Sequence, residues 1–185
     1  MDTLILFARA PRLGCVKRRL AAGVGQVAAL RFHRGQLGRL LRMMRGERRW
    51  RTEVVLTPDR AFLPAPHPVL PQGRGDLGAR MQRALARHRR AVLVGCDIPG
   101  VTREDIAEAF RALGRADAVF GPAEDGGFWL VGFGPRRPPR PFAGVRWSCA
   151  ETLADTLGNC TGHRVALVRR LRDVDTAEDL RALSG

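Results

Sequence analysis

Four groups of charged residues and glycines follow apolar runs of this sequence and could together hold a phosphate group and a metal ion. In chain order they are Gly14, Lys17 and Arg19; Asp97; Glu124, Asp125, Gly126 and Gly127; and Asp173 and Asp175. Carboxylates are typical ligands of Mg²⁺ in proteins, and cationic side chains neutralise phosphate oxygens. The pattern predicts a basic loop that faces several carboxylates across a metal–phosphate complex.

Lys17 is the only lysine among the 32 lysine and arginine residues of the chain. Lysine is a compact point charge on a flexible stem, whereas arginine is a planar fork. We therefore predict a functional position at which arginine does not serve. The alternative is chance, because a single lysine has to fall somewhere.

Each carboxylate also has a purely structural alternative. Asp97 could cap the helix that follows, although Thr102 is the better N-cap residue. Asp125 stands before two glycines and could be a turn residue. Asp175 precedes Thr176 and could belong to the start of the last helix. We expect metal binding at Asp97 and Asp175 and a role in the site for Asp125.

The elements that would position these residues alternate between strands and helices. Apolar runs predict strands at 3–9, 53–57, 69–70, 91–96, 116–120, 128–133 and 164–168, and helical spacing predicts helices at 21–44, 77–88, 102–113, 148–157 and 176–183. Asp76 is expected to cap the helix at 77–88. This alternation predicts an α/β fold with a mostly parallel sheet, and ligands of such sheets bind at the carboxyl ends of the strands. After the first strand, Pro11 and Gly14 make a turn whose N–H groups, together with the following helix start, favour an anion.

The composition limits the class of protein. The net charge of +14 could indicate a nucleic-acid partner, but the basic stretches 39–51 and 80–90 carry helical apolar spacing and the chain has no tyrosine. We therefore favour a solvated arginine-rich surface over a surface that binds nucleic acid.

Further expectations concern the cellular setting and the remaining ligand types. The four cysteines form no CxxC pair, which argues against a zinc site and a disulfide framework, and the four histidines show no ligand spacing and receive no role. No stretch is long and apolar enough to span a bilayer, and the first residues lack the pattern of a signal peptide. We expect a single domain over residues 1–185 in the cytoplasm.

Six motifs resemble one known family in the right order along nearly the whole chain. They lie at 7–20 (Phe7-Ala8-Arg9-Ala10-Pro11 to Leu20), 72–81, 95–100 (Gly-x-Asp-x-Pro-Gly), 121–132 (Gly-Pro-Ala-Glu-Asp-Gly-Gly-Phe-Trp-Leu-Val-Gly), 147–148 and 173–180. The family comprises small bacterial GT-A-like transferases, labelled radical-SAM/selenodomain-associated or arsenosugar-biosynthesis glycosyltransferases. It is similar to the nucleotide-diphospho-sugar transferases, a fold that also includes guanylyltransferases.

The resemblance implies a three-layer α/β/α, Rossmann-like GT-A fold and a role for each motif. It implies that Arg9, Gly14, Lys17 and Arg19 hold nucleotide phosphates, that Gly75 and Asp76 meet the nucleoside, that Asp97 and Asp175 bind Mg²⁺ or Mn²⁺, and that Glu124, Asp125, Gly126, Gly127 and Trp147 meet the acceptor. Lys17, Asp97 and Asp125 would be catalytic.

The chain departs from the family pattern at three places. Arg18 replaces threonine and is expected to lie outside the pocket, Ile98 stands where cysteine is frequent, and Phe128-Trp129 replaces tyrosines. We therefore expect a metal-dependent transferase with a nucleotide or nucleotide-sugar donor and a small-molecule acceptor. Glycosyl and nucleotidyl transfer both stay open, as does a homodimer. The alternative is a non-catalytic basic module that binds nucleotides or nucleic acid.

Overall fold

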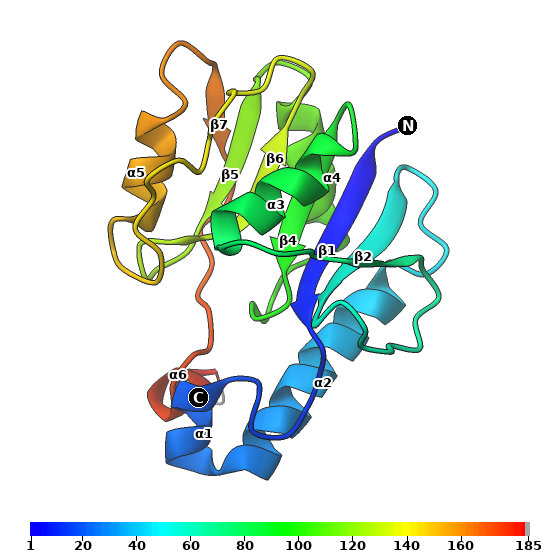
Figure 1. The fold of residues 1–185 in the computed structure, drawn as a ribbon, viewed down its shortest axis with the longest axis vertical. Coiled ribbons are helices and arrows are strands. Elements are labelled where there is room, and N and C mark those ends of the chain that lie inside the picture. Colours follow the sequence, from blue (N-terminus) through cyan, green and yellow to red (C-terminus); the bar gives the residue numbers. More distant parts are fainter. Residues whose placement is uncertain (184–185) are drawn as a thin grey trace.

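A seven-stranded sheet forms the centre of the computed structural model, which describes residues 1–183 (Figure 1). The end of the expected domain range, 184–185, lies outside the described residues. The strands are β1 (Thr3–Arg9), β2 (Arg51–Thr57), β3 (Val69–Pro71), β4 (Ala91–Gly95), β5 (Ala118–Pro122), β6 (Phe128–Phe133) and β7 (Val165–Leu167). Their order is β3-β2-β1-β4-β6-β5-β7, and β6 alone runs antiparallel to its neighbours. The expected mostly parallel α/β fold is confirmed.

Four helices cover the two faces of this sheet. Helices α2 (Gln26–Met43) and α4 (Arg103–Ala112) pack on one face, and α3 (Leu77–Ala86) and α5 (Thr152–Gly158) pack on the other. Leu6 and Val94 are buried against the first pair, and Ile5 and Leu93 against the second, as the two-residue period of a strand requires. Within the described residues, no helix has the length and apolar character needed to cross a membrane.

Two short helices extend the molecule beyond the carboxyl end of β1. Helices α1 (Arg18–Val24) and α6 (Ala177–Ala182) lie side by side below the sheet in Figure 1. A small apolar cluster that includes Leu20, Ala29 and Val174 joins them to the start of α2. Helices α1 and α6, which are far apart in the sequence, therefore form one wall beside the sheet.

Two of the expected helices differ from those observed. The helix expected at 21–44 is two helices, because Gly25 has φ 84° and ψ 155° and breaks the helical path between α1 and α2. The helix expected from Ser148 begins only at Thr152. Ser148 has φ 61°, a left-handed conformation that no helix can continue. The expected cap of α3 is confirmed, because the Asp76 carboxylate accepts a hydrogen bond from the amide of Ala79.

Many arginines stabilise the backbone, which revises the expectation of a merely solvated basic surface. Six of them donate hydrogen bonds to carbonyls that are distant in sequence: Arg39, Arg83, Arg90, Arg103, Arg137 and Arg169. The last four carbonyls of a helix have no partner within the helix, and a guanidinium offers several donors to such groups. Part of the high positive charge therefore has a structural cause that needs no nucleic-acid partner.

Candidate functional site

The residues predicted to do chemistry gather where β1 and β4 end. These two parallel strands are neighbours, and the chain leaves them toward opposite edges of the sheet. Such a change of direction opens a crevice at the carboxyl ends of the strands, which is where α/β sheets bind ligands. Asp97 follows β4 at this point, and Arg9 ends β1.

Three hollows meet at Asp97. The apolar hollow, of about 310 Å³, includes Phe7, Gln72, Arg80 and Met81 in its lining. The aromatic hollow, of about 280 Å³, is lined by Phe128, Trp129 and Trp147 together with Asp125, Ser148, Thr152 and Asp173. The basic hollow, of about 370 Å³, is lined by Arg9, Lys17, Arg18, Arg19, His33 and Asp175. Because Asp97 lines all three, a ligand that fills them would contact this carboxylate.

Lys17 links the two carboxylates that were expected to bind a metal. Its Nζ lies 3.4 Å from Oδ1 of Asp97 and 3.8 Å from Oδ1 of Asp175, and its side chain is only 5% exposed. Arg19 donates a 2.7 Å hydrogen bond to the other oxygen of Asp175 but is itself exposed. The prediction that Arg18 lies outside the pocket is wrong, since Arg18 lines the basic hollow.

The backbone is strained at two residues of the site. Lys17 and Ser148 are the two residues other than glycine with positive φ in the part of the chain described, at 47° and 61°. A left-handed conformation costs an ordinary side chain about 1–2 kcal/mol. Both residues line hollows that include Asp97. Strain of this kind persists where the surrounding structure overrides it, and it is common at functional sites.

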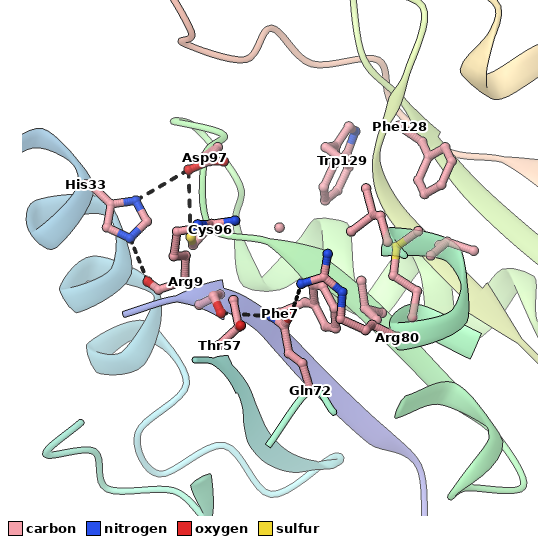
Figure 2. A pocket seen from close by; sticks show the side chains of 16 residues that line it. Phe7, Arg9, His33, Thr57, Gln72, Arg80, Cys96, Asp97, Phe128 and Trp129 are labelled. Carbon is pink, nitrogen blue, oxygen red and sulfur yellow. Dashed lines mark hydrogen bonds and ion pairs between the residues drawn. The ribbon is translucent and has the colours of Figure 1, made fainter. Parts of the chain in front are cut away.

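His33 is a site residue that the sequence did not reveal. It lies one turn from Ala29 and one turn from Leu37 on the buried face of α2, and it is 3% exposed. Figure 2 shows its ring between β1 and the loop after β4. Nε2 lies 2.8 Å from the carbonyl oxygen of Arg9, and Nδ1 lies 3.6 Å from Oδ1 of Asp97. Among residues 1–183, Nδ1 finds no hydrogen-bond partner.

The floor of the apolar hollow is held by a chain of hydrogen bonds. The buried Gln72 amide donates to the carbonyl oxygens of Ala8 and Val55, and its oxygen accepts a 3.1 Å hydrogen bond from Arg80 (Figure 2). The Gln72 amide thus fixes the Arg80 guanidinium beside an apolar surface that includes Phe7. An aromatic or heterocyclic ring could lie on this surface with its polar edge toward Arg80.

The wall of the aromatic hollow depends on two glycines. Gly121 lies so close to Trp129 that a Cβ at this position would stand 2.5 Å from the indole. Gly126 has φ 86°, and a Cβ there would stand 2.2 Å from the carbonyl oxygen of Ala150. The Asp125 carboxylate accepts a hydrogen bond from the amide of Gly127, so it has the turn role while it also lines the hollow.

Two carboxyl groups of the site have shifted pKa values. Burial raises the pKa of Asp97, but the His33 ring and the Lys17 ammonium lower it, and the lowering prevails. Burial, reinforced by the negative charge of Asp125, raises the pKa of Asp173 above its ordinary value. The site therefore stabilises the charged form of Asp97 and destabilises the charged form of Asp173.

The structure brings most, but not all, of the predicted residues together. Arg9, Lys17, Arg19, Asp97 and Asp175 line the basic hollow, and Asp125, Gly127 and Trp147 line the aromatic hollow. Gly14, Gly75, Asp76, Glu124 and Gly126 line none of the three hollows. In the sequence, His33 is a polar residue within the apolar stripe of a predicted helix. This pattern does not distinguish a metal ligand from a histidine buried in the core.

Comparisons with known proteins agree with this fold. A family model described as an uncharacterized protein conserved in bacteria (DUF2064) matches residues 40–149. A protein of Desulfovibrio desulfuricans G20, described provisionally as a nucleotide-diphospho-sugar transferase, is 31% identical with a TM-score of 0.91, and the match covers 98% of this chain and 85% of that one. No curated protein sequence matches.

More distant structures share the fold alone. The 2-C-methyl-D-erythritol 4-phosphate cytidylyltransferase of Thermus thermophilus is 20% identical with a TM-score of 0.58, over 98% of this chain and 95% of that one. A protein of Mycobacterium tuberculosis H37Rv in complex with manganese is 17% identical with a TM-score of 0.54, over 98% and 97%. The sheet is thus that of nucleotide-diphospho-sugar transferases and cytidylyltransferases, which confirms the expected fold. The radical-SAM-associated label stays a prediction.

Proposed function

The chain belongs to the bacterial family DUF2064, and we propose that it is a metal-dependent nucleotidyltransferase that uses a nucleoside triphosphate. The observation that carries this proposal is the charge of the basic hollow. Four cationic side chains line it together with two carboxylates, Asp97 and Asp175, which gives a net charge of +2. A nucleotide with its phosphates in this hollow would extend into the other two hollows past Asp97.

The charge favours a triphosphate over a nucleotide sugar. A nucleoside triphosphate carries about four negative charges near neutral pH, and one divalent cation leaves about two, which the hollow would balance. A nucleotide sugar carries about two negative charges, which the cation alone would neutralise. The positive charge of the hollow would then remain without a counterpart. This difference supports nucleotidyl over glycosyl transfer.

The residues fit a divalent cation. Carboxylate oxygens of Asp97 and Asp175 approach one shared point, now taken by the Lys17 ammonium, and Nδ1 of His33 is buried beside Asp97 without a partner. When bound, such an ion would neutralise negative charge on the phosphate oxygens during transfer. Lys17, Arg9 and Arg19 would hold the triphosphate oxygens, and Arg80 would orient the base in the apolar hollow.

The aromatic hollow would take the acceptor, and its lining indicates the acceptor's chemistry. Asp97, Asp125 and Asp173 line it, whereas none of the described residues around it is lysine or arginine. A phosphorylated acceptor would find no cationic partner among these lining residues, so we assign an uncharged or cationic acceptor with a hydroxyl group. The hydroxyl oxygen would form a bond to the α-phosphorus, the bond to the bridging oxygen would break, and pyrophosphate would leave. Asp125 would accept the hydroxyl proton.

Relatives support the general class. The Desulfovibrio protein is named for nucleotide-sugar transfer and the Thermus enzyme for cytidylyl transfer, and the mycobacterial protein holds manganese. The Thermus enzyme is named for a phosphorylated acceptor. The three aspartates of the aromatic hollow favour a different acceptor for this chain.

A thermal-shift panel tests the donor. Nucleoside triphosphates and nucleotide sugars are each added with Mn²⁺ or Mg²⁺. A donor at about 100 times its dissociation constant stabilises the fold by roughly 2.7 kcal/mol, or about 5–10 °C for a chain of this size. Phosphorus NMR with a polyol acceptor then identifies the product, and we expect pyrophosphate. Release of a nucleoside diphosphate from a nucleotide sugar would overturn nucleotidyl transfer, and no shift by any nucleotide would overturn the nucleotide site.

Three variants locate the donor and acceptor sites. We expect Asp97→Asn to lose the metal-dependent shift. Asp117→Asn, at the opposite end of the sheet beside Arg164, removes an equal charge and should keep the shift. Asp125→Asn preserves the acceptor for the Gly127 amide, so donor binding should remain while turnover falls at least about 100-fold. Full turnover of this last variant would exclude Asp125 as the proton acceptor.

A further inference from the structure

The hydrogen bond at Nε2 fixes which nitrogen of His33 carries the proton. Nε2 lies 2.8 Å from the carbonyl oxygen of Arg9, and a carbonyl oxygen can only accept. Nε2 therefore carries the hydrogen, and in the neutral ring Nδ1 carries a lone pair. Nδ1 is buried, and no group in the described part of the chain makes a hydrogen bond to it.

Nδ1 of His33 faces another acceptor across a gap. Oδ1 of Asp97 lies 3.6 Å away, beyond the usual length of a hydrogen bond, and an ionised carboxylate has no proton to donate. The pair His88 and Glu53 provides an internal comparison, because its nitrogen and oxygen are only 2.9 Å apart. The His88–Glu53 pair is thus at hydrogen-bond length, whereas the two atoms of the His33–Asp97 pair lie beyond it.

A cation between these two atoms would explain the arrangement. Histidines that bind metals usually donate their other ring N–H to a carbonyl or carboxylate, as His33 does to Arg9. Two ligands about 2.0–2.1 Å from a tetrahedral ion lie about 3.3 Å apart, close to the observed gap. Lys17 approaches the same carboxylate oxygen, but it does not supply a partner for Nδ1.

We propose that Nδ1 of His33 is a ligand, with Asp97, of the cation at this site, and that the site prefers a transition-metal ion such as Mn²⁺ or Zn²⁺ to Mg²⁺. An imidazole nitrogen suits transition metals, whereas Mg²⁺ binds through oxygen and retains its water. This inference rests on the proposed metal site at Asp97 and adds a nitrogen ligand to it. Sγ of Cys96 lies 3.7 Å from Oδ1 of Asp97, on the same side of the loop (Figure 2).

Manganese provides a direct test. Mn²⁺ is added to the full chain without nucleotide, and electron spin-echo spectroscopy detects any directly bound ¹⁴N. Calorimetry measures the affinities for Mn²⁺ and Mg²⁺. We expect a ¹⁴N signal and an at least tenfold preference for Mn²⁺. His33→Gln should lose the nitrogen signal and weaken Mn²⁺ binding about 10–100-fold, with little change for Mg²⁺. His88→Gln, the matched control, should retain both properties.

The outcomes separate this inference from the proposed function. Mn²⁺ binding without a nitrogen signal, or with the same signal in His33→Gln, would overturn the role of His33 and leave the carboxylate site intact. Failure of both ions to bind would overturn the metal site and this inference together. Unchanged Mg²⁺ affinity in His33→Gln shows that the variant is folded at the site. If His33→Gln also loses its Mg²⁺ affinity, the smaller replacement His33→Asn is measured instead. Its Mn²⁺ binding is expected to be as weak as that predicted for His33→Gln.

Discussion

In the absence of metal, replacing Lys17 by methionine should lower the stability of the protein. When metal is added, the variant should gain more stability than the wild type does. The buried ammonium lies 3.4 Å from Asp97 and 3.8 Å from Asp175, so it neutralises both carboxylates at once. Methionine has a similar length but no charge. In the Lys17→Met variant the two carboxylates would repel each other without an intervening cation.

The magnitude follows from the exposure of the partners. Removing one member of a fully buried ion pair costs about 3–5 kcal/mol. Here the Asp97 side chain is 48% exposed and that of Asp175 is 33% exposed, so water screens part of the charge. We therefore expect a loss of about 1–2 kcal/mol in the free energy of unfolding. For a chain of this length the melting temperature would fall by about 2–8 °C.

The assay compares melting temperatures with and without Mn²⁺ in the absence of nucleotide. In the wild type, the ammonium competes with the ion for the same oxygens, and this competition is absent from Lys17→Met. We expect at least tenfold tighter Mn²⁺ binding, which adds about 1.4 kcal/mol of stabilisation at equal ion concentration. Binding of the triphosphate should weaken, because the variant has lost a phosphate partner.

Arg19→Met is the matched control, since it removes a cation from the same Asp175 but from an exposed position. It should change stability by less than about 1 kcal/mol. Equal destabilisation by the two variants, or a Mn²⁺ response of Lys17→Met no larger than that of the wild type, would refute the shared-cation interpretation of Lys17.

Two further predictions concern stability away from the basic hollow. Gly121→Ala should lower the free energy of unfolding by about 1–3 kcal/mol in denaturant titrations, because its Cβ would meet Trp129. Gly35→Ala, in an open helical position, should raise this free energy by about 0.5–1 kcal/mol. Equal effects of the two variants would contradict the packing argument. The side-chain hydrogen bond from Arg49 holds the pKa of Glu47 at about 2, below its ordinary 4.5, so this pair stabilises the fold above pH 4.5 and loses its effect as the pH falls toward 2. The stability difference between wild type and Arg49→Ala should therefore shrink over this range, and a constant difference would contradict the assigned shift.

Apolar runs and turn residues sufficed to predict the order of strands and helices, apart from the break between α1 and α2. The runs at 3–9 and 91–96 are buried strands, and the rule for carboxyl ends correctly predicted that the loops after them meet. The short connection at 123–127 could have predicted one more feature. So few residues can join only antiparallel neighbours, and β6 is antiparallel to β5.

The details of the site depend on contacts that no local pattern contains. Gly25 ends α1, although the apolar spacing continues past it. The spacing of apolar residues carries no information about a single residue with positive φ. Lys17 was expected to hold phosphate, and its position between two carboxylates follows from the packing of α1 against α6. His33 reaches Asp97 because its ring lies at the end of β1, where it contacts the carbonyl oxygen of Arg9, and β4 is the neighbouring strand.

The basic hollow takes its charged residues from segments that are far apart in the sequence, which has a consequence for truncation of the chain. Lys17 precedes α1, Asp97 follows β4, and Asp175 lies between β7 and α6. A variant that is cut after β7 retains Lys17 and Asp97 but lacks Asp175 and Val174, which packs with Leu20 and Ala29. We expect such a shortened variant to bind metal and nucleotide weakly, because one carboxylate of the basic hollow is missing.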